Sequence, residues 1–201
     1  WSPDGERIAY VNAPNFSVGS LRVIRADDGE QIKLPANIRA RGELFFHPDG
    51  RRLLGRFSAT GYPQRLTWFD LDSGSVTIIP GVGPNDLTAL SRARIHYALS
   101  GDGDSILFAM NMDRPDEQGG NNGPQMDLFR IDSAGGKAEK IVRFPARIHN
   151  LCWDGVGEGC FVVTDLGGAH YDIWHVPLKN SLRDMRKISS AAADEDWPSV
   201  S

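Results

Sequence analysis

Short segments in which apolar and polar residues alternate follow one another along the chain, with turn-forming residues between them. The first segment, residues 6–12, carries an apolar run from Ile8 to Val11 directly after the turn sequence SPDG. Apolar residues at consecutive positions predict a strand that is buried on both faces. Since the 3.6-residue periodicity of an amphipathic helix is almost absent, the pattern predicts an all-β fold.

The turn sequence recurs at regular intervals. Pro at its second position sets φ for a type I turn, and Gly at its fourth position adopts the left-handed conformation that closes a hairpin through a bulge. The chain has HPDG at 47–50, SGDG at 100–103 and a degenerate copy, DGVG, at 154–157, and Ser201 begins a fifth copy. Successive copies are 45 to 54 residues apart. This spacing is typical of β-propeller blades and of other repeat architectures.

Each repeat also has a second half that reads as strand, turn and strand. These segments are SLRVIRADDGEQIKLP, QRLTWFDLDSGSVTIIP, MDLFRIDSAGGKAEKIVRF and YDIWHVPLKNSLRDMRKIS. Four short strands per period, joined by hairpins, are what one four-stranded antiparallel blade of a β-propeller requires. A lone blade cannot bury both faces, so neighbouring blades are expected to stack. We therefore predict a single partial β-propeller domain over 1–201, with repeats at 1–42, 43–95, 96–148 and 149–195 and the start of another at 196–201.

These repeats resemble the TolB-like, WD-repeat-like β-propeller family. Residues 1–10 match the Trp-Ser-Pro-Asp-Gly turn and IAY-like strand of its repeat, and residues 196–201 match the lead-in to that turn. The resemblance implies about four blades of a larger propeller of six to eight blades, located in the periplasm or outside the cell. The open blade edges of such a segment would allow self-association, or pairing with sequence outside this chain.

Composition and charge narrow the classes of partner. The 201 residues are 40% hydrophobic and 24% charged, and no run of about 18 apolar residues occurs, so no membrane span is expected. No signal peptide, with a basic segment followed by an apolar one, is visible at the start of the chain. The formal net charge is -4 and the basic residues are scattered, which argues against nucleic acid as a partner.

The two cysteines, Cys152 and Cys160, flank the segment WDGVGEG. This segment can turn a hairpin and place the cysteines on facing strands, which would allow a disulfide. The interpretation favoured here is that both are reduced and serve as small, buried apolar side chains.

A repeated motif points to a candidate binding site. ARIH occurs at 93–96 and at 146–149, and ARGE occupies the equivalent position at 40–43. In a propeller, the first strand of each blade lines the central channel, and the loops that lead into these strands gather on one face. We therefore expect six side chains at the channel mouth: Arg41, Glu43, Arg94, His96, Arg147 and His149.

Histidines and arginines around one opening can bind a small anionic ligand. Together with Glu43, His96 and His149 could instead hold the metal ion of an enzyme site. The structural alternative is that related repeats keep the same packing residues, with each histidine bonded to a backbone carbonyl. The prediction is an anion or peptide site with no metal and no other cofactor.

The longest predicted loop, residues 111–125, lies on the same face of the predicted propeller. Loops of this length without regular structure tend to be functional or disordered. Asp113 in this loop, and His170 in the equivalent loop of the fourth repeat, complete the predicted ligand-binding residues.

Known catalytic signatures are absent from the sequence. It contains no Gly-x-Ser-x-Gly elbow, no His-Glu-x-x-His, no phosphate-binding Gly loop and no Cys-x-x-Cys pair. Enzymatic activity is left open. The first functional prediction is a non-catalytic module that binds a protein, a peptide or a small anion on its channel face. The alternative is an accessory propeller domain of a larger peptidase-type or amidohydrolase-type hydrolase, whose catalytic domain lies outside this chain.

Overall fold

The repeated turns form the hairpins that their sequences predict. In the computed structural model, the Gly50 N–H donates to the His47 carbonyl oxygen over 2.8 Å, and the Gly103 N–H donates to the Ser100 carbonyl oxygen over 2.9 Å. The φ angles of Gly50 and Gly103 are 69° and 81°. Residues with a side chain rarely adopt this left-handed conformation, which explains the glycine at the end of each turn. The structure describes residues 1–13, 18–59, 65–82, 95–110, 125–166, 170–179 and 183–189.

Within these ranges every regular element is a β-strand, so the all-β prediction is confirmed. No helix of the described residues is long and apolar enough to cross a membrane. The chain divides into two units, Trp1–Val82 and Gly83–Ser201, called unit 1 and unit 2 below. The predicted repeat boundaries and the single domain over 1–201 stay predictions.

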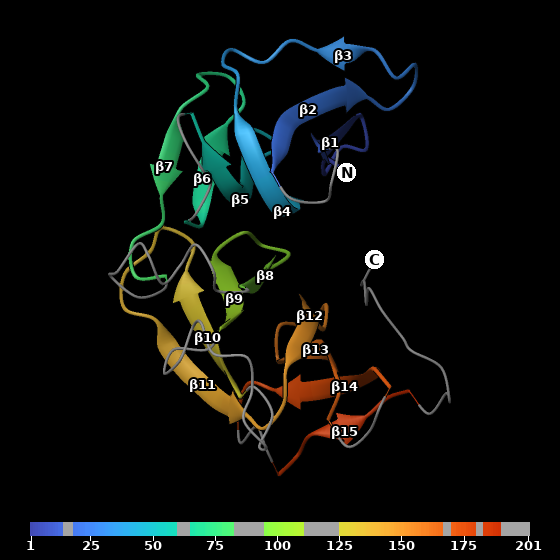
Figure 1. Ribbon diagram of the computed structural model, residues 1–201, viewed down its shortest axis with the longest axis vertical. Helices are drawn as coiled ribbons and strands as arrows, with labels where there is room; N and C mark the ends of the chain where they lie inside the picture. Colours follow the sequence, from blue (N-terminus) through green and yellow to red (C-terminus); the bar gives the residue numbers. More distant parts are fainter. Residues whose placement is uncertain are drawn as a thin grey trace. The chain divides into compact units, whose positions relative to one another are not determined.

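Unit 1 contains a seven-stranded antiparallel sheet in the order β1-β2-β4-β5-β6-β7, with β3 paired to β2 (Figure 1). Its strands are β1 (Arg7–Asn12), β2 (Gly19–Arg25), β3 (Gln31–Ile32), β4 (Arg39–Phe46), β5 (Arg52–Ser58), β6 (Thr67–Asp70) and β7 (Val76–Ile78). The strands of the first two repeats thus share one sheet. The pairs Gly19↔Ala40 and Ser20↔Arg39 join β2 to β4.

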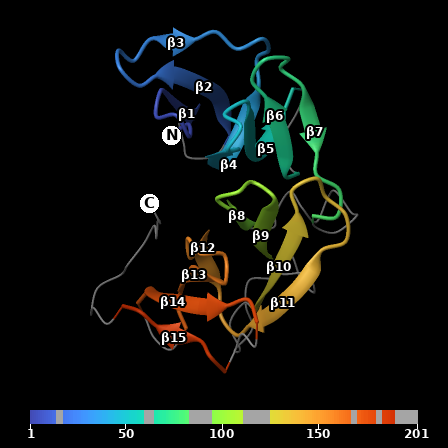
Figure 2. The same cartoon turned by 180° about the vertical axis from the view of Figure 1, so that it is seen from behind.

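Unit 2 contains two separate four-stranded antiparallel sheets, in the orders β11-β10-β9-β8 and β12-β13-β14-β15 (Figure 1, and from behind in Figure 2). The strands of the first are β8 (His96–Leu99), β9 (Ser105–Met110), β10 (Met126–Asp132) and β11 (Glu139–Phe144). Those of the second are β12 (Ile148–Trp153), β13 (Gly159–Thr164), β14 (Asp172–Pro177) and β15 (Arg186–Lys187). Both sheets have the four-stranded antiparallel form predicted for a blade.

Each unit has its own apolar core. In unit 1, Leu21 and Val23 of β2 share a core with Phe57 of β5 and Phe69 of β6. In unit 2, all six residues of β9 are buried, so this strand is covered on both faces. The ring of Phe108 in β9 stacks on that of Phe129 in β10, with centroids 5.0 Å apart.

The first strand differs from its prediction. β1 is half-buried rather than covered on both faces, and Tyr10 is 41% exposed. In the described part of unit 1, β1 pairs with β2 alone and forms the edge of the sheet. An edge strand lacks neighbours on one side, so its apolar residues are covered less completely than those of a central strand.

Both thiols are free, as the favoured interpretation of the cysteines predicts, but only Cys160 is buried, whereas Cys152 is half-buried. In the β12–β13 hairpin, Cys152 pairs with Phe161, whereas Cys160 pairs with Trp153. Side chains alternate between the faces of a sheet, so Cys152 and Cys160 point to opposite faces and cannot bond without a change of register. Burial raises the pKa of the Cys152 thiol to about 11 and also raises the pKa of Cys160. Both cysteines are therefore protonated, weakly reactive thiols at neutral pH.

Candidate binding site

The amino-terminal ends of β8 and β12 lie at the same end of unit 2. His96, the first residue of β8, pairs with Ala109 of β9, and β9 continues to Met110 beside the start of β10. The Ile148 N–H at the start of β12 donates to the sulfur of Met126, the first residue of β10, over 3.1 Å. We call this end, where β8, β10, β12 and β14 begin, the strand-start end.

A hydrogen bond near the other ends of β8 and β12 supports this arrangement. The indole N–H of Trp153, at the end of β12, donates to the carbonyl oxygen of Ala98 in β8 over 3.2 Å. β8 and β12 therefore pack side by side and run in the same direction. The predicted residues His96 and His149 thus both lie at the strand-start end.

His149 is set apart by an irregularity of β12. Ile148 pairs with Thr164 and Asn150 pairs with Val163, so His149 is the extra residue of a β-bulge. Its side chain is only 16% exposed, and its ring lies 4.2 Å from that of Tyr171, measured between centroids. Bulges often redirect a side chain at the end of a sheet, which is the effect seen for His149.

Asp165, just beyond the end of β13, links two of the predicted residues. Its Oδ1 accepts a hydrogen bond from the Arg147 backbone N–H over 3.3 Å, and its Oδ2 lies 3.8 Å from His149 Nε2. His170 is exposed and precedes Tyr171 at the start of β14. The structure thus places Arg147, His149 and His170 at the strand-start end, where two residues not predicted, Asp165 and Tyr171, also lie. We call these five residues the strand-start cluster.

The other predicted residues lie elsewhere. His96 is half-buried at the start of β8, at the same end as the cluster. Arg41 and Glu43 are half-buried in β4 of unit 1, where the ladder with β5 is also irregular, between Arg41 and Phe45. Arg94 and Asp113 lie outside the described residues. The structure therefore places four of the eight predicted residues, Arg147, His149, His170 and His96, at the same end of unit 2.

Two buried aspartates form ion pairs at the strand-start end, at the beginnings of β10 and β14. Asp127, near the start of β10, accepts hydrogen bonds from the Arg143 guanidinium over 2.9 and 3.0 Å and contacts Lys140 Nζ at 2.6 Å. Asp172, at the start of β14, contacts Lys187 Nζ at 2.8 Å. Burial alone would raise the pKa of Asp127, but the bonds from Arg143 and Lys140 outweigh burial and keep its pKa below the usual value.

Tyr171 and Asp165, the two cluster residues not predicted from the sequence, differ in whether a sequence pattern indicates them. Tyr171 directly follows His170, which was already a predicted residue, and an aromatic residue there can pack against a histidine ring. Asp165 comes after a β13 strand whose sequence is ordinary. Its contact with Arg147 depends on the register of β12 and β13, and the bulge at His149 shifts that register. No sequence pattern indicates this bulge.

The cluster offers hydrogen-bonding, cationic and aromatic groups. Among the described residues, no group of three or more His, Cys, Asp or Glu side chains is placed to hold a metal ion. His149, His170 and Arg147 can interact with an anion, and the Tyr171 ring provides a flat surface beside them.

Comparisons with known proteins identify the fold. No protein-family model matches the sequence, and no curated protein matches it. Among solved structures, TolB from Acinetobacter baumannii is 20% identical and aligns with a TM-score of 0.64 over 97% of this chain and 43% of its own. The chain has a TolB-like β-propeller fold. A candidate TolB from Agrobacterium tumefaciens agrees, at 16% identity and a TM-score of 0.68 over 96% of this chain and 61% of its own.

Another chain with this TolB-like fold is an enzyme. Oligogalacturonate lyase from Vibrio parahaemolyticus is 15% identical and has a TM-score of 0.64 over 96% of this chain and 51% of its own. The present chain spans 43% to 61% of the length of these three structures. At such low identity the likeness establishes the fold alone, because propellers host many unrelated activities. The predicted partial propeller is confirmed, and the function has to be argued from the site.

Proposed function

We propose that this TolB-like chain is a non-catalytic binding module that recognises a protein or peptide segment, or a small anionic ligand, through the strand-start cluster. The observation that carries the proposal is the bulge at His149, whose ring lies close to both Tyr171 and Asp165. Loops and strand ends at one end of a rigid β-scaffold are a common location for ligand binding.

The chemistry of the cluster favours a carboxylate-bearing ligand. The Asp165 carboxylate lies 3.8 Å from His149 Nε2, and an imidazole N–H can donate a hydrogen bond to a carboxylate. Arg147 and the exposed His170 supply further donors. Charge-assisted hydrogen bonds from such groups to a carboxylate are about twice as strong as neutral ones. An acidic peptide segment that also contacts the Tyr171 ring would use every group in the cluster except Asp165, whose carboxylate lies beside His149.

The location expected from the family resemblance, the periplasm or the extracellular space, is part of this proposal, and cell fractionation tests it. The alternative function, an accessory propeller domain of a larger hydrolase, stays a prediction. The complete coding sequence tests the alternative, because it would have to encode a catalytic domain beside the propeller.

Selection from a random peptide library displayed on phage tests the binding proposal. We expect the wild-type protein to enrich acidic peptides. Arg147→Gln and His149→Ala should each weaken the affinity for a selected peptide about tenfold, since a hydrogen bond to a charged group contributes about 1.5–3 kcal/mol. Isothermal titration calorimetry with a synthetic peptide measures these changes.

Lys137→Gln provides the matched control. Lys137 is exposed between β10 and β11, at the end of unit 2 opposite the cluster, and its substitution removes the same charge as Arg147→Gln. It should leave the affinity unchanged. An equal loss in Lys137→Gln, or no loss in both cluster variants, would refute the proposed site. Titration with free glutamate separates the two ligand classes, because a peptide site binds glutamate far more weakly than the selected peptide.

A further inference from the structure

A pocket opens in unit 1 where the edge of β2 is shared between two partners. β2 pairs with β3 through Val23↔Ile32 and with β4 through Ser20↔Arg39. Between these two ladders, residues 33–38 leave the sheet, and the Leu21 N–H donates to the Ile38 carbonyl oxygen over 2.9 Å. The cavity between β2 and this connection has a volume of about 280 Å³. This volume is at the lower limit of small-molecule sites.

The charges around this pocket are all positive. Its charged lining residues are Arg22, Lys33 and Arg39, and no Asp or Glu lines it. Within the described part of the chain, none of these three side chains takes part in an ion pair or a hydrogen bond. Arg25, three residues after Arg22 on the same strand, instead pairs with Asp28 and Glu30. The acidic residues of this hairpin thus neutralise Arg25 and leave the pocket cations uncompensated.

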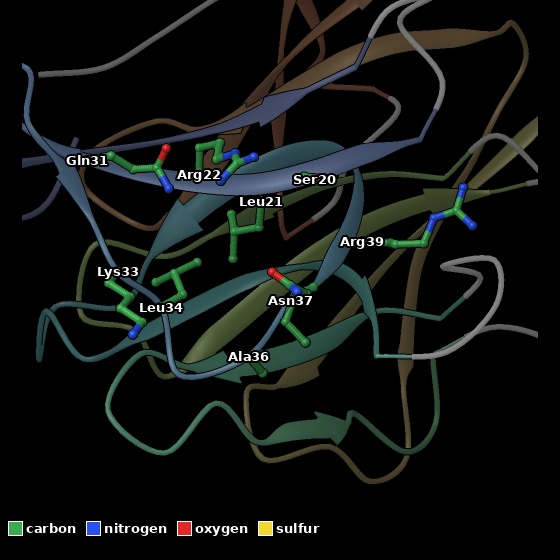
Figure 3. Close-up of a pocket in the computed structure, with 10 residues that line it drawn as sticks. Ser20, Leu21, Arg22, Gln31, Lys33, Leu34, Ala36, Asn37 and Arg39 are labelled. Carbon is green, nitrogen blue, oxygen red and sulfur yellow. The ribbon is translucent and has the colours of Figure 1, made fainter.

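The polar neighbours of these cations can also bind an anion. The hydroxyl of Ser20 and the side-chain amides of Gln31 and Asn37 line the same pocket, and each contains a hydrogen-bond donor. Figure 3 shows Gln31 and Arg22 along one side of the opening, Lys33 on another and Asn37 near its middle, while Arg39 extends outward. Lys33 and Arg39 are exposed, and exposed side chains change rotamer within nanoseconds. Both can therefore turn toward an anion held by Arg22.

The backbone of the pocket is held in place. Leu34 and Ala36 pack against the core of unit 1. Pro35 lies so close to Gly74, in the turn between β6 and β7, that a Cβ at position 74 would come within 2.9 Å of its Cγ. The connection formed by residues 33–38 is thus anchored on both sides. The pocket is therefore preformed before a ligand binds.

A cavity in unit 2 differs from this pocket in its charges. That cavity, of about 880 Å³, is lined by Arg130, Lys179 and Arg186 but also by Glu139, Glu158 and Asp184. Charges of both signs compensate one another there. In the unit 1 pocket, three like charges repel one another, and an anion would relieve this repulsion.

We propose that the unit 1 pocket binds a small ligand that carries two negative charges on its oxygen atoms, either a phosphate or a dicarboxylate. This site is separate from the strand-start cluster, and none of its residues belongs to the set predicted from the sequence. A doubly charged group can accept bonds from Arg22 and Lys33 together, and the amides of Gln31 and Asn37 complete its coordination.

Calorimetric titration of the full chain at low ionic strength tests this proposal, with inorganic phosphate and succinate as the two probes. We expect at least one probe to bind at a single site. Arg22→Gln and Lys33→Gln should each weaken that binding about tenfold, because each removes one charge-assisted hydrogen bond. The probe that binds more tightly identifies the ligand class as phosphorylated or dicarboxylic.

Arg51→Gln is the matched control, since Arg51 is an exposed arginine of unit 1 that does not line the pocket. It removes the same charge and should leave the affinity unchanged. Arg147→Gln should also have no effect, which separates this site from the strand-start cluster. The proposal is overturned if neither probe binds the wild type, if both pocket variants bind normally, or if Arg51→Gln loses as much affinity as Arg22→Gln.

Discussion

Units 1 and 2 are built from the same kind of repeat, yet they organise their strands differently. In unit 1, the β2–β4 ladder joins the strands of two repeats into one sheet, and β1 forms a half-exposed edge. In unit 2, each repeat forms its own four-stranded sheet, and the central strand β9 is buried at all six positions. Apolar runs of similar composition are thus covered to different extents, because burial depends on the neighbours of a strand as well as on its sequence.

The largest expected effect tests this difference in burial directly. Phe108→Ala in β9 should lower the free energy of unfolding by about 3–5 kcal/mol, because it leaves a cavity beside Phe129 in a fully buried strand. Tyr10→Ala in β1 should cost about 1 kcal/mol or less, since this side chain is 41% exposed. Urea denaturation measures both. Equal losses would mean that β1 is as well covered as β9.

The second prediction compares the ion pairs of the two units. Asp127→Asn in unit 2 should cost about 1.5–3 kcal/mol at pH 7, because the buried carboxylate accepts bonds from Arg143 and Lys140. Asp28→Asn in unit 1 should cause no measurable change in stability, since Asp28 and its partner Arg25 are exposed and water screens their interaction. Thermal denaturation of both variants beside the wild type measures the difference.

The pH dependence of the Asp127 variant follows from the lowered pKa of this carboxyl in the folded protein. A carboxyl with a lowered folded-state pKa stabilises the fold above its unfolded-state pKa of about 3.9, and this contribution disappears as the pH falls through the folded-state value. The stability difference between wild type and Asp127→Asn should therefore be constant from pH 7 to about pH 5 and shrink below about pH 4. A difference that grows on acidification would show that Asp127 is not stabilised as its anion.

The third and smallest prediction asks whether the close packing of unit 2 extends to the hairpin of β12 and β13. A Cβ at Gly159 would lie 2.5 Å from His175 Nε2 and 2.9 Å from the Val176 carbonyl oxygen. Gly159→Ala should therefore cost about 1–3 kcal/mol through overpacking. Gly101→Ala is the control, because no atom lies within 4 Å of its added Cβ, and it should change stability by about 0.5 kcal/mol or less. Similar effects of both variants would contradict the packing described for this hairpin.

The features of the fold that the sequence predicts correctly are those determined locally. The turns at Gly50 and Gly103 follow from the conformational preferences of Pro, Asp and Gly, and their spacing predicts the blades. The half-exposure of β1 and the β2–β4 ladder depend on which strands become neighbours, and residues 6–12 contain no information about that. The facing arrangement considered for Cys152 and Cys160 also depends on the register of β12 and β13. In the structure Cys152 pairs with Phe161, so the two cysteines are one residue out of register with each other.

The candidate site shows the same division between local and long-range information. Equivalence between repeats predicts that His96 and His149 lie at one end of their sheets, and they stand at or next to the first residue of β8 and β12. Asp165 was missed because its contact with Arg147 crosses two strands beside a bulge. The pocket cations Arg22 and Lys33 were missed because they are close only where residues 33–38 fold back along β2.

Hydrogen–deuterium exchange with a library-selected peptide tests the central claim, that the strand-start end of unit 2 is the binding surface, most directly. Bound peptide should slow amide exchange at 147–149, 164–166 and 170–172, the backbone that carries the strand-start cluster. Exchange at 155–158, in the turn at the opposite end of β12, should not change. Protection confined to 155–158 or to unit 1 would contradict the account and place the binding surface elsewhere.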